Sequence, residues 1–491
     1  MMKRTWWAGG VLTAMLLGVY SAPAADTWYV ALSGDHTDFT NWTTAATNIQ
    51  AAVDRAASSG DQVLVKAGNY ALTNEIVIEK GLLVQGVDGS NVTFIGGQYP
   101  AFTNRCVYIN HADAILDGFT ITNGYITSGM ASGVLISNGT LRNCVILRNS
   151  GASANPATGG GVAVGNGLVH NCLIVSNRYA GGSGVRIFAN AGVVSNCVIA
   201  YNSGGWVTFG GGVSSQGLLV DCLVSNNSAH YTGGVQINGS LNLASLALNC
   251  VIVNNTCNNS VGGVGFWDGG IASNCIVRRN RGTTGGIIMS GGASKPCKVY
   301  NCTITTNTSL SSSGSGGVTM GNYSLLQNCL VGDNTGTNYA GGLYVSGTTG
   351  IDVKSCTIAG NRCYGGVGGF GDTNNAGRVL NTIIYNNSDV VGVGDNWHTW
   401  APVGGDLSNC VYSCSTPAIT GNGNKSDDPL FLDAASGNYQ LRADSPCVNA
   451  GSNETWMLNA VDLDKSRRIF RGRVDMGAYE NIFKGTFFSI Q

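Results

Sequence analysis

A cluster of basic side chains lies in the middle of the sequence. Arg278, Arg279 and Arg281 share one short segment, and Lys295 and Lys298 follow it closely. Guanidinium groups bind carboxylates and other oxyanions through paired hydrogen bonds. The cluster therefore suits an acidic polymer as its ligand, although most charge clusters are only the solvated edge of a fold.

The segment DVVGVGDNWHTWAP, residues 389–402, gathers a second set of aromatic and titratable side chains. Indole rings present large apolar faces on which a sugar ring can stack, and irregular loops on rigid scaffolds often carry binding sites. Asp395, Trp397 and Trp400 are therefore candidate substrate-binding residues, and His398 is a candidate catalytic residue. The alternative is that both tryptophans cover the end of a hydrophobic core.

Carboxylates are scarce in the same part of the chain. Between Met130 and Trp400 there is no Glu, and the acidic residues are Asp221, Asp268, Asp333, Asp352, Asp372, Asp389 and Asp395. Glycoside hydrolysis needs a pair of carboxyl groups, calcium prefers a tight group of them, and zinc needs closely spaced Cys and His. We therefore predict no metal and no cofactor, and a hydrolase is disfavoured.

Composition and the first residues indicate the compartment. Charged residues make up 11% of the chain and the net charge is -1, which disfavours nucleic acid and anionic membranes as partners. Lys3 and Arg4, the apolar run 6–19 and the small residues 22–24 have the form of a signal peptide. We therefore predict a signal peptide at 1–24, a secreted or cell-surface location, and no membrane span in the mature chain.

The elements that position these residues come from an internal repeat. Cysteines recur at intervals of 25 to 28 residues, with Thr382 once in their place, and an Asn stands five residues after each of these positions from Cys144 to Thr382. The cysteines are Cys144, Cys172, Cys197, Cys222, Cys250, Cys275, Cys302, Cys329, Cys356 and Cys410. Glycine pairs followed by Val, Ile or Leu recur in step. Such a period indicates a solenoid.

Within one repeat, apolar residues three positions before and two positions after the cysteine should face inward with it. Strict alternation would turn the first of them outward, so the chain must bend at the intervening Asn, a residue that tolerates left-handed backbone angles. Stacked coils about 4.8 Å apart then align the recurring Asn side chains in a hydrogen-bonded ladder. Eleven such coils give a rod on the order of 50 Å long.

These repeats resemble those of right-handed parallel β-helix proteins with the pectin-lyase-like fold. NIQAAVDRAASSGDQVLVKAGNY, residues 48–70, resembles the opening of that family, an amphipathic helix that caps the solenoid followed by its first strand. The resemblance implies an all-β protein of about a dozen coils. DDPLFLDAASGNYQLRADSPCVNAG and VDLDKSRRIFRGRVDMGAYE resemble the C-terminal module of choice-of-anchor type β-helix proteins. The predicted regions are 25–424 for the β-helix with its cap, 425–480 for the module and 481–491 for a tail.

Two further expectations concern the cysteines and the module. The chain has sixteen cysteines, and those of the repeat should be buried free thiols because their column points inward. Cys414 and Cys447 lie outside that column and are the better candidates for a disulfide. In the module, Asp462, Asp464, Asp475 and Glu480 alternate with arginines, and ion pairs between them should close the open end of the solenoid.

The resemblance leaves three functional classes. The best supported is a structural or glycan-binding, adhesive protein, and the glycine-rich repeats are also similar to those of polymorphic outer-membrane proteins. Lyases of the β-helix family abstract a proton with Arg or Lys, often with calcium, so the alternative is a polysaccharide lyase with Arg278, Arg279 or Arg281 as its base. A glycoside hydrolase is the third. One fold hosts many activities, so the fold alone does not separate them.

Overall fold

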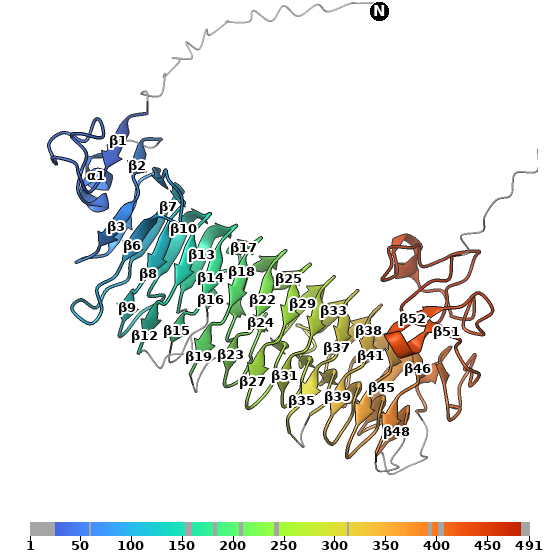
Figure 1. Cartoon of the computed structure of the whole chain (residues 1–491). Coiled ribbons are helices and arrows are strands. Elements are labelled where there is room, and N and C mark those ends of the chain that lie inside the picture. The colour runs from blue at the N-terminus through green and yellow to red at the C-terminus, as the bar shows by residue number, and fades with distance from the viewer. Residues whose placement is uncertain are drawn as a thin grey trace, which may run out of the picture.

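The protein is a long parallel β-solenoid, seen from blue to orange in Figure 1. The computed structural model describes residues 25–482 except 58–59, 153–159, 180–183, 206–209, 240–244, 312–313, 391–394 and 401–406. The predicted signal peptide, residues 1–24, lies outside the described residues. Three parallel sheets of 25, 14 and 11 strands, here called sheets A, B and C, run along about a dozen coils. The predicted fold class is confirmed.

Sheet A begins with single strands and then contributes two short strands to each coil. The first strands are β1 (Thr27–Val30), β2 (Gln62–Val65), β4 (Ile76–Ile78), β5 (Leu83–Gly86), β7 (Val107–Asp117), β10 (Val134–Arg142) and β13 (Val162–His170). The pairs are β16 (Val185–Ile187) with β17 (Val193–Ser195), β20 (Val213–Ser215) with β21 (Leu218–Val220), β24 (Val235–Asn238) with β25 (Leu246–Leu248), β28 (Val264–Trp267) with β29 (Gly270–Ser273), β32 (Ile287–Met289) with β33 (Cys297–Tyr300), β36 (Val318–Met320) with β37 (Ser324–Gln327), β40 (Leu343–Val345) with β41 (Ile351–Lys354), β44 (Phe370–Asp372) with β45 (Gly377–Leu380), and β48 (Trp397–Thr399) with β49 (Cys410–Val411).

Sheets B and C each take one strand from a coil. Sheet B contains β3 (Gly68–Ala71), β6 (Thr93–Gly96), β8 (Thr120–Thr122), β11 (Val145–Leu147), β14 (Leu173–Val175), β18 (Val198–Ala200), β22 (Leu223–Ser225), β26 (Val251–Val253), β30 (Ile276–Arg278), β34 (Thr303–Thr305), β38 (Leu330–Gly332), β42 (Thr357–Ala359), β46 (Ile383–Tyr385) and β50 (Cys414–Ser415). Sheet C contains β9 (Tyr125–Ile126), β12 (Ser150–Gly151), β15 (Arg178–Tyr179), β19 (Ser203–Gly204), β23 (Ser228–Ala229), β27 (Thr256–Cys257), β31 (Arg281–Gly282), β35 (Thr308–Ser309), β39 (Thr335–Gly336), β43 (Arg362–Cys363) and β47 (Ser388–Asp389).

The turn between sheets A and B has the predicted left-handed bend. The residue before each repeat cysteine from Cys144 to Cys356 has a positive φ, 54° at both Asn249 and Asn274. The assignment of Cys410 to this column is wrong, because it lies on β49 of sheet A opposite Val379. The bend brings Ala247 and Ile252 to the inside together with Cys250, and all three are fully buried. The inward columns predicted from the period are therefore confirmed.

The second Asn of each repeat forms a buried ladder at the turn between sheets B and C. Nδ2 of Asn255 donates to Oδ1 of Asn280 in the next coil at 3.0 Å and to the carbonyl oxygen of Val224 in the previous coil at 3.0 Å. The backbone N–H of Asn255 also donates to Oδ1 of Asn280. The same pattern continues to Asn387, whose partner Asn396 extends the ladder by one coil. The predicted ladder is confirmed.

The N-terminal cap matches the predicted helix but holds one more strand. Helix α1 (Ile49–Arg55) buries Ile49, Ala52 and Val53, and the side chain of Asn48 accepts a hydrogen bond from its first turn. Strand β2 follows, as expected. The sequence prediction missed β1, which precedes the helix and pairs with β2 in parallel.

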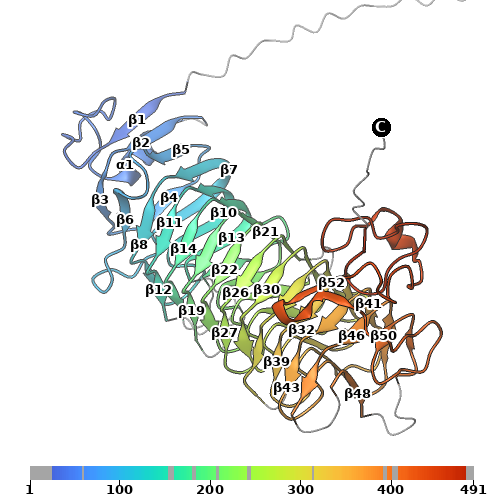
Figure 2. The ribbon, with the colours of Figure 1, turned by 45° about the vertical axis from the view of Figure 1, so that its right-hand side comes forward.

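The C-terminal residues pack on the side of the solenoid, and this corrects the expectation that they close its end. The hairpin of β51 (Phe431–Asp433) and β52 (Asn438–Leu441) lies in an apolar cluster with Leu330, Ala359 and Ile383 on the outer face of sheet B. Short 3-10 turns span Ala434–Ser436 and Thr455–Asn459. In Figure 2 this red module lies beside the last coils, near β46 and β50. The end of the core is instead covered by Leu407, Ile419 and Trp397.

All sixteen cysteines are buried free thiols. This confirms the prediction for the repeat column, where the thiol of Cys250 donates to the carbonyl oxygen of Leu248 at 3.2 Å. The disulfide predicted for Cys414 and Cys447 is wrong in this structure. Both side chains lie in the apolar cluster beneath the module, and the Cys414 thiol donates to the carbonyl oxygen of Asp427 at 3.2 Å.

Candidate functional site

The structure divides the predicted basic cluster among three sheets. Arg278 points outward from β30 in sheet B, Arg279 occupies the following left-handed turn, and Arg281 lies on β31 in sheet C. All three are exposed, and none of them forms an ion pair with a described residue. Lys298 lies on β33 in sheet A, and Lys295 pairs with Asp268 at 3.7 Å. Arginines and lysines therefore do not form one continuous patch.

Side chains of the aromatic segment point to opposite faces of sheet A, because successive residues of strand β48 alternate between the core and the outside. Trp397 pairs with Phe370 in β44 and turns inward, where its ring packs against the core and its Nε1 donates to the carbonyl oxygen of Pro417 at 2.9 Å. This placement fits the alternative of a core cover. Asp395 is exposed, and its Oδ1 accepts a hydrogen bond from the backbone N–H of Asp389 at 2.9 Å.

His398 and Trp400 face outward and join two tyrosines in what we call the aromatic cluster. The His398 and Trp400 ring centroids are 4.7 Å apart at 73°. Tyr339 stacks on Tyr344 with centroids 4.5 Å apart at 15°, and the Trp400 ring stands edge-on to Tyr344 at 6.2 Å. Trp400 is 38% exposed and Tyr344 is 8% exposed. The cluster thus presents an exposed indole beside the buried ring of Tyr344.

The glycine at position 371 leaves room for the Trp400 indole, because it has no side chain. Gly371 lies between Tyr344 and His398 in the same outward column of sheet A. A Cβ built there would meet Cζ3 of Trp400 at 2.8 Å, which is too close for ordinary contact. Gly371 therefore lets the Trp400 ring approach the backbone of the sheet.

Acid–base groups are poorly placed at the aromatic cluster. Burial lowers the pKa of His398 below its ordinary value, so the imidazole is neutral at pH 7. Its ring has no hydrogen-bonding partner among the described residues. Burial raises the pKa of Tyr344, whose hydroxyl accepts a hydrogen bond from Oγ1 of Thr373 at 2.7 Å. Asp372 points inward and is held by the backbone N–H groups of Asn374 and Gly377.

A second aromatic side chain lies on the same face of sheet A. Trp267 is 45% exposed, and its Nε1 donates to Oε1 of Gln236 at 3.0 Å. One outward column links this point to the aromatic cluster through Gly265, Ile288, Thr319, Tyr344, Gly371 and His398. Its five steps correspond to about 24 Å at the usual strand spacing. A chain-like ligand could therefore reach both tryptophans.

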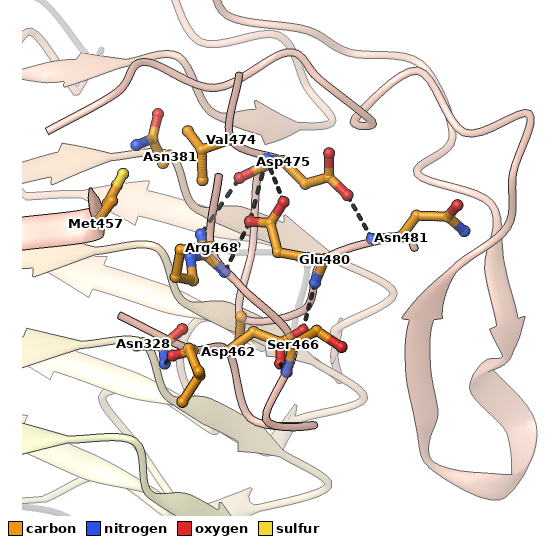
Figure 3. A network of polar contacts seen from close by, with 12 residues as sticks. Asn328, Asn381, Met457, Asp462, Ser466, Arg468, Val474, Asp475, Glu480 and Asn481 are labelled. Carbon is orange, nitrogen blue, oxygen red and sulfur yellow. Dashed lines mark hydrogen bonds and ion pairs between the residues drawn. The ribbon is translucent and has the colours of Figure 1, made fainter. Parts of the chain in front are cut away.

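The densest group of charges lies inside the C-terminal module and is shown in Figure 3. Nη1 of Arg468 lies 3.3 Å from Oε1 of Glu480, and both side chains are fully buried. Asp475 and Asp462 accept backbone hydrogen bonds around them. Burial raises the pKa of Glu480 to about 9 against the opposing attraction of Arg468. No ligand can reach these groups, so the network is structural.

The described residues contain no set of three His, Cys, Asp or Glu side chains that could hold an ion. In the same part of the chain, no helix has the length and hydropathy needed to cross a bilayer.

Sequence reasoning identified Trp400 and His398 but missed Tyr339 and Tyr344. Tyr344 stands two residues after the pair Gly341 and Gly342, at the position that points outward in every coil. Aligning coils on their glycine pairs would have placed it in one column with Gly371, one coil before His398, where Asp395 and Asn396 replace the pair.

No family model matches the sequence, and no curated protein matches it. Several solved structures are similar in fold at low identity. Pectate lyase Pel9A is 12% identical, with 93% of this chain and 96% of that chain covered and a TM-score of 0.34. The Agl-KA catalytic domain is 13% identical, with 78% and 69% covered and a TM-score of 0.37. PfbA, a surface adhesin of Streptococcus pneumoniae, is 12% identical, with 66% and 88% covered and a TM-score of 0.35. Likeness at this level spans unlike activities and does not choose among them.

Proposed function

We propose that the chain is an exported β-helix protein that binds glycans through the aromatic cluster. The observation that carries this proposal is the exposed indole of Trp400, set over Gly371 and backed by Tyr344. Aromatic faces held rigidly in this way lose little conformational freedom on binding, which favours affinity. The signal-peptide pattern of residues 1–24 supports export to the cell surface or beyond.

Binding rather than turnover is the better supported activity of this site. His398 has no acidic partner among the described residues, and the nearest strand carboxylate, Asp372, faces the core. An exposed indole face without paired acids stacks on a sugar ring but does not protonate a glycosidic oxygen. The ligand class is therefore a polysaccharide or a cell-surface glycan.

A polysaccharide lyase is the second candidate, supported by one observation. Arg278, Arg279 and Arg281 are exposed at the corner of sheets B and C, free to meet a uronate carboxylate. Of the lysines that were expected to complete their surface, Lys298 lies on sheet A, and Lys295, in the turn before it, pairs with Asp268.

One experiment tests both candidates. The mature protein and its Trp400→Ala, Arg279→Ala and Tyr201→Ala variants are titrated calorimetrically with neutral and acidic polysaccharides. Ultraviolet absorbance of unsaturated uronides and new reducing ends are recorded in parallel, with and without calcium. Tyr201 is 64% exposed and lies on another turn, so it is the control for loss of a surface ring.

We expect binding without turnover and a loss of about 2 kcal/mol, roughly 30-fold in Kd, for Trp400→Ala alone. Unsaturated products that disappear with Arg279→Ala would establish the lyase instead. Equal binding by the wild type and Trp400→Ala would refute the assignment of the cluster.

A further inference from the structure

The outward face of sheet B carries a column of residues that is apolar without interruption from Val145 to Ile276. In register along the sheet it runs Val145, Leu173, Val198, Leu223, Val251 and Ile276, and then Thr303, Leu330, Thr357 and Ile383. Toward the N-terminus it continues through Thr120, Phe94 and Asn69. We call the part from Asn69 to Ile276 the open column.

The chain itself covers the other part of this column. Leu330, Thr357 and Ile383 are 4%, 1% and 1% exposed, and the C-terminal module packs its hairpin and Met476 over them. In the open column, Leu173, Val198 and Ile276 are 38%, 38% and 40% exposed. Phe94, Val145, Leu223 and Val251 are half-buried, and Thr120 is 5% exposed, with its hydroxyl donating to the carbonyl oxygen of Ser90. The module thus covers the strand face at one end, whereas no other element lies over β11 to β30 in Figure 1 and Figure 2.

We propose that the open column is a dimer interface, covered by the open column of a second copy of this chain. The face offers no pattern of charge that would select an unrelated partner, because its two outward columns from β3 to β30 contain one charged residue, Arg278. A second copy presents the same apolar rows at the same spacing, so the rows can interdigitate along their whole length. Faces related by a two-fold axis are self-complementary in this way.

The module decides how the two copies align. It stands out from sheet B at one end, so a parallel pair would place both modules in the same gap. In an antiparallel pair centred on Leu173, the module begins six strands from the axis, at Leu330, whereas sheet B of the partner ends four strands away, at Asn69. Each module then lies beyond the first sheet B strand of the other copy. In this arrangement Leu173 faces its own copy, and Val145 faces Val198.

The size of the surface sets the expected strength. Nine overlapping strands give a length of about 38 Å, and a strip about 15 Å wide then buries on the order of 600 Å² per copy. This buried area is at the low end for a stable protein complex, so the dimer should dissociate at micromolar concentrations.

Sedimentation velocity from low micromolar concentrations up to about 100 µM tests the proposal, because an interface of this size associates within that range. We expect wild-type mass to rise from one to two copies. Leu173→Lys should remain monomeric, because it places two ammonium groups face to face. Leu310→Lys, at a 46% exposed position in the loop after sheet C, should behave as the wild type. A wild type that stays monomeric throughout, or Leu173→Lys that still dimerises, would overturn the dimer.

Cross-linking with a short bismaleimide tests the alignment. The native thiols are buried, so the wild type should give no product. Leu173→Cys should link to its own copy, and Ile276→Cys should not. Efficient linking of Ile276→Cys to itself would refute the antiparallel arrangement.

Discussion

Replacing Asn255 by alanine tests the buried ladder in the middle of the solenoid. The Asn255 side chain is fully buried and takes part in four hydrogen bonds. Nδ2 donates to Val224 and Asn280, and Oδ1 accepts from the backbone N–H and from Nδ2 of Asn227 at 3.0 Å each. Alanine removes all four and leaves polar groups of both neighbouring coils buried without partners.

The expected loss is about 2–5 kcal/mol of unfolding free energy, since each orphaned buried group costs roughly 1–3 kcal/mol and some relaxation is expected. The matched control is Asn254→Gly. Asn254 is the preceding residue, exposed and at φ 56°, where glycine is unstrained, so its loss should stay within about 0.5 kcal/mol.

Urea denaturation monitored by circular dichroism gives the global change, and amide hydrogen exchange gives the local one. Because a solenoid unfolds in units of neighbouring coils, faster exchange should centre on the coils of Asn227, Asn255 and Asn280. Equal stability of Asn255→Ala and Asn254→Gly would show that the ladder contributes nothing beyond its turns, and the reasoning would fail.

Three more predictions follow from buried groups. The pKa of Glu480 is about 9 in the native protein and near 4.5 in the unfolded chain. The stability that protonated Glu480 contributes is therefore complete below pH 4.5 and is lost as the pH rises to 9. Unfolding free energy should thus fall by up to about 1.4 kcal/mol per pH unit, a slope that Glu480→Gln should remove in pH-dependent denaturation. All sixteen thiols are buried, and burial raises the pKa of Cys144 to about 12. A thiol reagent at pH 8 should therefore label no cysteine until denaturant is added, and early labelling would contradict the inward column. Trp397→Ala should lower stability by about 1–3 kcal/mol in thermal melts but leave glycan affinity unchanged. Weakened binding would show that Trp397 takes part in the binding site.

The fold was predictable because inward positions repeat. A cysteine that must fit between stacked coils, and an Asn that must bond the coils above and below, leave few alternatives, so Cys250 and Asn255 have counterparts throughout. The docking of the module was not predictable. Leu330 and Ile383, which it covers, are the same kinds of residue as Leu173 and Ile276, which it does not. Only the three-dimensional path of the chain distinguishes them.

The candidate site was only half predictable for the opposite reason. Outward positions in sheet A do not repeat, because no neighbouring side chain requires a particular residue type there. One column contains, in order, Gln236, Gly265, Ile288, Thr319 and Tyr344. Tyr344 reaches Trp400 only because Gly371 stands between their coils and leaves space. A substitution there tests whether the site depends on this gap. Gly371→Val should displace the indole and weaken glycan binding about as much as Trp400→Ala while leaving the inward ladders intact, and unchanged binding would mean that the indole does not need the sheet beneath it.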